Sequence, residues 1–95
     1  MPYRKKIVLN CVSGNRAELH TLVTSFMRDG VKFVGVVGRD CRVVEEEIDE
    51  LCVGDGSRPY EMLTSSHVNE PLATAVAFAQ ALGLEFSGEV QVVEL

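Results

Sequence analysis

Two residues of this sequence carry side chains that could act as a nucleophile or a base. Cys11 ends a short apolar run, where a helix N-terminus and an arginine could lower its pKa and make it a thiolate nucleophile. His67 follows a predicted strand and precedes Glu70, so it could serve as a general base or an anion ligand. The simpler interpretations are a buried small side chain for Cys11 and a hydrogen-bonded loop residue for His67. His20 lies inside a predicted helix, and no metal-ligand spacing occurs, so we expect no metal and no cofactor.

Short polar and basic residues cluster where predicted strands give way to helices. The N-terminal part, residues 1–44, holds eight basic and three acidic residues, a balance of +5, whereas residues 45–95 hold one base and eleven acids, a balance of −10. Together with free amide groups at helix N-termini, the arginines of the first part could hold a phosphate or a carboxylate. The predicted rim comprises Ser13, Asn15, Arg16, Arg39, Arg42, Thr64, Ser65, Ser66 and His67.

Hydrophobic periodicity predicts four strands that alternate with three helices. Short β-branched runs predict strands at 5–12, 31–37, 60–66 and 89–95. Apolar stripes at helical spacing predict helices at 16–29, after Asp40 up to the loop at 54–59, and at 71–82. Strict alternation indicates a single α/β domain over residues 1–95, with a parallel sheet between helical layers.

The most probable topology on these rules is a flavodoxin-like three-layer sandwich with strand order 2-1-3-4. One helix then covers one face of the sheet and two cover the other. The third strand is the most polar, which is unusual for a central position, and an edge position would move the predicted site. For order 2-1-3-4, ligands should bind between the loops after the first and third strands. The expected ligand-binding residues are Ser13, Asn15, Arg16, Arg39, Ser66 and His67.

The run Lys6-Ile7-Val8-Leu9-Asn10-Cys11-Val12-Ser13-Gly14 resembles the first strand and loop of phosphotransferase-system IIB domains. Those domains place a phospho-accepting cysteine after the first strand of a small 2-1-3-4 sheet. The resemblance implies a second hypothesis, a thiol-based phosphoryl-transfer enzyme or phosphocarrier. Cys11 would then be the nucleophile, Arg16 the phosphate clamp and His67 a proton carrier. As a whole, the chain resembles small single-domain α/β proteins of bacteria that have no assigned function.

The third predicted helix lacks a charged outer face. No charged residue occurs between Pro71 and Leu84, and small residues on an outer face let another helix approach closely. We therefore expect this helix to contact a second copy of the chain or another protein, although an alanine-rich surface of good helix formers is the plainer alternative. The predicted interface comprises Ala73, Thr74, Ala77, Gln80 and Ala81.

Size, charge and cysteine content exclude several classes of protein. The chain has 95 residues and a net charge of −5, an unfavourable balance for a nucleic-acid binder. Its longest uncharged stretch is too short to cross a bilayer, so no membrane association is expected. Three widely spaced cysteines suit free thiols in the cytoplasm. The first hypothesis is thus a non-enzymatic cytoplasmic binding or interaction module, a homodimer with a possible small-anion site at the carboxyl edge of the sheet.

Overall fold

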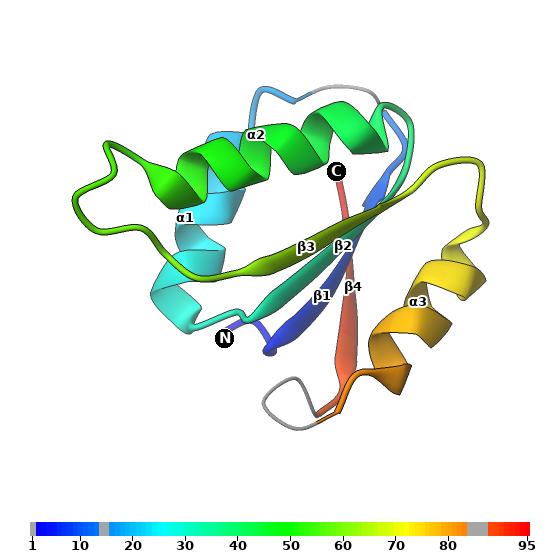
Figure 1. The fold of residues 1–95 in the computed structure, drawn as a ribbon. Helices are drawn as coiled ribbons and strands as arrows, with labels where there is room; N and C mark the ends of the chain where they lie inside the picture. Colours follow the sequence, from blue (N-terminus) through cyan, green and yellow to red (C-terminus); the bar gives the residue numbers. More distant parts are fainter. Residues whose placement is uncertain (1, 14–15, 84–87) are drawn as a thin grey trace.

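A computed structural model describes residues 2–13, 16–83 and 88–95 of the chain. Strands and helices alternate along it, as the hydrophobic periodicity predicts (Figure 1). The elements are β1 (Lys6–Cys11), α1 (Leu19–Asp29), β2 (Phe33–Gly38), α2 (Cys41–Val53), β3 (Leu63–His67), α3 (Leu72–Ala81) and β4 (Val90–Glu94). All four strands pair in parallel in one sheet, which confirms the predicted α/β class.

The predicted strand order 2-1-3-4 is wrong, because the sheet runs β3-β2-β1-β4. The chain steps sideways from β1 to β2 to β3, and α3 then carries it back to β4 on the far side of β1 (Figure 1). Burial explains the difference. Five of the six residues of β2 are buried, whereas His67 is the single buried residue of β3. A polar strand loses less hydration at an edge than between two neighbours, and an all-apolar strand belongs in the centre.

The helices form two layers, with α1 and α2 on one face of the sheet and α3 on the other (Figure 1). This confirms the predicted division into two helices and one. Alternate residues of β1 point to opposite faces, so Ile7 and Leu9 pack toward α1 and α2 while Val8 packs toward α3. The core thus has two parts, and the central strands are mostly apolar because they are covered on both faces.

None of the three helices has a side-chain cap at its N-terminus. Asp40 occupies the N-cap position of α2 as predicted, but in the left-handed conformation (φ 56°) and without a capping hydrogen bond. Pro71 is itself the N-cap of α3, so the helix begins at Leu72, one residue later than predicted. The first-turn amide groups of α2 therefore lack side-chain partners, which matters for the site described below.

A buried lysine caps the C-terminal end of α3. Lys6, the first residue of β1, is 1% exposed, and its Nζ donates hydrogen bonds to the carbonyl oxygens of Ala79 (2.7 Å) and Leu82 (3.3 Å). The last turn of α3 contains no basic residue of its own. The ammonium of Lys6 thus supplies, from a strand, the positive charge that a helix C-terminus favours.

No helix in the described parts of the chain is long and apolar enough to cross a membrane.

Candidate functional site

The loops after β1, β2 and β3 lie at the carboxyl edge of the sheet, with the β2 loop in the middle. This loop contacts the end of β1 directly. The amide of Arg39 donates to the Cys11 carbonyl oxygen at 2.8 Å, and Arg39 Nη1 donates to the Ser13 carbonyl oxygen at 3.4 Å. On the other side, the register pairs Val37 with His67. The corrected strand order therefore keeps the three predicted loops together but makes Arg39, rather than Ser13, the central residue.

An open depression of about 500 Å³ lies between the start of α2 and the turn that follows β3. Most of its lining comes from the β2–α2 connection, and the rest comes from the turn. Asn69 in that turn has a left-handed backbone (φ 60°). The lining residues are Gly38, Arg39, Asp40, Cys41, Arg42, Val43, Val68 and Asn69.

Two arginines give this depression positive side-chain charge. Arg39 and Arg42 are exposed, and neither forms an ion pair with any residue that the structure describes. The first turn of α2 has no acidic residue to satisfy its amide groups. Asp40 is the one carboxylate among the lining residues, and Arg16 Nη1 lies 4.0 Å from it. Two guanidinium groups without a carboxylate partner among the described residues therefore lie beside a helix N-terminus, which carries partial positive charge.

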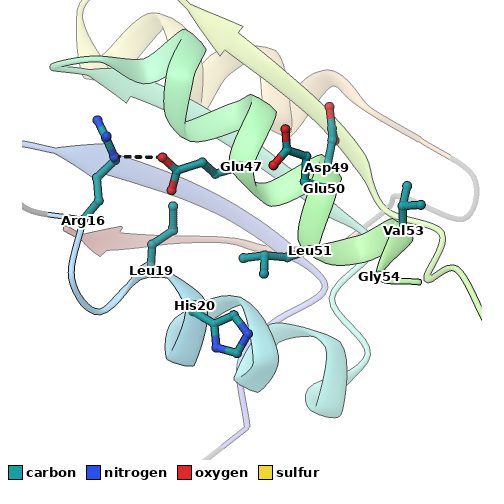
Figure 2. Close-up of a pocket in the computed structure, with 9 residues that line it drawn as sticks. All are labelled: Arg16, Leu19, His20, Glu47, Asp49, Glu50, Leu51, Val53 and Gly54. Carbon is teal, nitrogen blue, oxygen red and sulfur yellow. Dashed lines mark ion pairs between the residues drawn. The ribbon is translucent and has the colours of Figure 1, made fainter. Parts of the chain in front are cut away.

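Arg16 differs from Arg39 and Arg42 in that it already has carboxylate partners. Its Nε lies 3.0 Å from Glu47 Oε1, and Figure 2 shows this pair at one end of a groove between α1 and α2. The groove encloses about 940 Å³. Its lining comprises Arg16, Leu19, His20, Glu47, Asp49, Glu50, Leu51, Val53 and Gly54. Arg16 thus offsets the charge of an acidic side chain of α2 and is not among the residues that line the depression. Asn15, another predicted ligand residue, lies outside the described residues.

His67 belongs to a hydrogen-bonded chain of three side chains. Its Nε2 lies 2.9 Å from Ser65 Oγ, and its Nδ1 lies 2.9 Å from Glu70 Oε1. The imidazole is buried and packs edge-on against Phe78, with 5.1 Å between ring centroids. Ser65 is one of the predicted rim residues, but its contact with His67 is not predicted. Residues two apart on a strand share a face, and that rule would have linked them.

Ser66 lies on the opposite face of β3 from His67. Thr64, two residues earlier on β3, shares that face and donates a hydrogen bond to Asp49 of α2 at 2.8 Å. The predicted set of ligand residues is therefore divided between the two faces of β3, because successive side chains of a strand alternate.

Cys11 is buried in the core beneath α1 and α2. Burial, with smaller contributions from Cys41 and Asp40, raises the pKa of its thiol to about 11. The group is therefore neutral at physiological pH, whereas a nucleophilic cysteine requires a lowered pKa.

We expect iodoacetamide to label Cys11 of the folded protein slowly at neutral pH. A raised pKa favours the neutral thiol, so the rate should increase only as the pH approaches about 11. Cys52 is a suitable internal reference, because it is also buried and burial also raises its thiol pKa. Mass spectrometry of alkylated peptides measures both rates, and labelling in urea shows that each thiol reacts once exposed. Faster labelling of Cys11 than of Cys52 in the folded protein would support the phosphoryl-transfer hypothesis instead.

The outer face of α3 is exposed at every predicted interface position, from Ala73 to Ala81. Phe78 lies beside it and is 45% exposed. The opposite face of α3 packs on the sheet, where Ala75 and Ala79 are fully buried. Contact of this face with a second copy or another protein stays a prediction.

No three His, Cys, Asp or Glu side chains of the described ranges come together as a metal site. The chain was also compared with known proteins. The family described as "Domain of unknown function (DUF7684)" matches residues 1–92. The chain belongs to this family. It matches no curated protein and no solved structure. DUF7684 membership agrees with the resemblance to small domains without an assigned function, and no comparison supports a likeness to phosphotransferase-system IIB domains.

Proposed function

We propose that this DUF7684 protein is a binding module that holds a small anion at the carboxyl edge of its sheet. The ligand would occupy the depression between the start of α2 and the turn after β3. One observation carries the proposal, namely that the uncapped N-terminus of α2 is flanked by Arg39 and Arg42, neither of which is paired with a carboxylate in the described structure.

The chemistry of these groups favours a phosphate or carboxylate group. First-turn amides point outward from a helix N-terminus, and guanidinium groups donate two hydrogen bonds in the plane of an oxyanion. The depression of about 500 Å³ is in the size range of small-molecule sites, so the anionic group could carry a small organic substituent. The acidic charge of residues 45–95 disfavours a polyanion such as a nucleic acid.

The alternative, phosphoryl transfer through Cys11, has less support from the geometry. A phosphoryl acceptor must be accessible and ionised, and Cys11 is 4% exposed with a thiol pKa of about 11. Simple binding needs neither property.

Replacing Arg42 with glutamine should weaken anion binding about tenfold, because one charge-assisted hydrogen bond contributes about 1.5 kcal/mol. The measurement is a titration of the ¹⁵N-labelled protein with inorganic phosphate, sugar phosphates and nucleotides, followed by amide chemical shifts. Saturable shifts should centre on residues 38–43 and 68–69.

Arg58→Gln is the matched control, because it removes the same charge from an exposed loop beyond the C-terminal end of α2. It should leave the affinity within twofold of the unmodified protein. Equal losses in Arg42→Gln and Arg58→Gln would mean that the anion responds only to overall charge, and the proposal would be overturned. An absence of saturable shifts with every anion would overturn it as well.

A further inference from the structure

We propose a second, independent site, in which Ser65 is a nucleophile activated by His67 and positioned by Glu70, acting on esters with a small apolar acyl group. The three side chains form one continuous hydrogen-bonded chain, with both donor–acceptor distances at 2.9 Å. In this order, the hydroxyl can act as a nucleophile, the imidazole as its base, and the carboxylate as the group that orients the imidazole. None of these three side chains lines the proposed anion-binding depression.

The carboxylate of Glu70 decides the direction of the hydrogen bond at Nδ1 of His67. An ionised carboxylate can only accept, so Nδ1 of His67 must carry the proton that lies between them. The proposed mechanism uses the neutral ring, in which Nε2 carries the lone pair and accepts the hydrogen bond from Ser65 Oγ. This is the tautomer that a general base for serine requires.

Ser65 is accessible because it lies on an edge strand that α3 covers incompletely. It is half-buried, and the residue paired with it on β2 is Gly35, which has no side chain. A Cβ built at Gly35 would lie 3.4 Å from Ser65 Oγ, so the serine hydroxyl lies over the glycine backbone. The Phe33 ring also occupies the space above Gly35, because its Cε2 and Cζ would lie 3.1 Å from the same Cβ.

The surroundings of Ser65 indicate the substrate class. Leu63 lies two residues before Ser65 on the same face of β3, and it is 44% exposed. Phe78 borders that face from α3 and is 45% exposed. An apolar acyl or aryl group could contact these two side chains while its carbonyl carbon faces Ser65. The Leu63 amide donates to the carbonyl oxygen of Lys32, which directly precedes β2. Successive backbone amides of a strand point to opposite sides, so the amide of Ser66 points outward from the sheet edge, where it can approach an oxyanion.

The proposed reaction is transfer of an acyl group to Ser65 and then to water. Ser65 Oγ forms a bond with the acyl carbon while its proton passes to Nε2 of His67. The ester carbon–oxygen bond breaks, and the leaving alcohol takes that proton. Water then attacks the acyl carbon, delivers a proton through His67 and releases the carboxylic acid and free Ser65. Glu70 keeps Nδ1 protonated throughout and acts as a positioning residue.

The test uses p-nitrophenyl acetate with the full-length protein. We expect release of p-nitrophenolate together with acetylation of Ser65, located by peptide mass spectrometry. Ser65→Ala should abolish that acetylation, and His67→Gln should slow it about 100-fold, the usual contribution of a general base. Glu70→Gln should also slow it, and Glu70→Asp should restore part of the rate, which a purely structural role would not predict.

Ser57→Ala is the matched control, because Ser57 Oγ donates directly to the Asp55 carboxylate at 2.6 Å and has no imidazole partner. It should react at the unmodified rate, and amide spectra should show each variant folded. Acetylation confined to lysines, an unmodified Ser65 in the folded protein, or an unchanged rate in Ser65→Ala would each overturn the proposal. None of these results would bear on the phosphate titration, so the two sites fail separately.

Discussion

Gly38→Ala is expected to lower the free energy of unfolding by about 3 kcal/mol, the upper range for a strained backbone position. Gly38 ends β2 with φ +98°, a region that residues with a side chain rarely adopt. A Cβ there would lie within 2.4 Å of the Cys11 carbonyl oxygen. That oxygen cannot move away easily, because it accepts a hydrogen bond from the Arg39 amide at 2.8 Å.

Gly30→Ala separates the two causes of this loss. Gly30 also has a positive φ (+79°), but no heavy atom lies within 4 Å of the position that its Cβ would take. It should therefore show the conformational cost alone, about 1 kcal/mol. Urea unfolding followed by circular dichroism measures both variants. Equal losses in the two would show that contact with Cys11 contributes nothing.

Lys6→Met is expected to lower the free energy of unfolding by about 2 kcal/mol, the usual effect of removing hydrogen bonds to a charged group. Methionine keeps much of the length of the side chain but removes the ammonium that holds the Ala79 and Leu82 carbonyl groups. The Leu82 oxygen and the C-terminal end of α3 then face a thioether, which has no hydrogen-bond donor. The last turn of α3 has no basic residue that could offset the partial negative charge of these carbonyl groups.

Lys5→Met provides the control, because Lys5 precedes Lys6 and is exposed. It removes the same charge and should change stability by less than about 0.5 kcal/mol. Amide hydrogen exchange should also show faster exchange in α3 of the Lys6→Met protein. If Lys6→Met is as stable as the unmodified protein, desolvation of the buried ammonium cancels its hydrogen bonds, and the capping role is incorrect.

The two proposed sites meet at the turn after β3. Val68 and Asn69 line the depression at the start of α2, and they lie between His67 and Glu70, which belong to the hydrogen-bonded chain on the other side. The left-handed backbone of Asn69 reverses the chain there. One short turn therefore positions residues for both sites, although their ligands would approach from different directions.

The order, type and approximate ends of the elements could be predicted from the sequence, because they depend on local periodicity. Leu19, Val23 and Phe26 recur at helical spacing, and all three are buried. The carboxyl-edge location of Ser13 and Arg39 could also be predicted, since loops after parallel strands meet at one edge. Neither inference needs any knowledge of which strands are neighbours.

The strand order, the role of Lys6 and the chain of Ser65, His67 and Glu70 required the tertiary structure. The position of β3 depends on how much hydration each strand loses, which is a comparison among all four strands rather than a property of one. Lys6 acts on a carbonyl 73 residues away in sequence, so no local pattern records the contact. The proton on Nδ1 of His67 depends on the carboxylate that folding places beside it. Periodicity determines on which face of a helix or strand a residue lies, whereas packing determines which other elements contact that face.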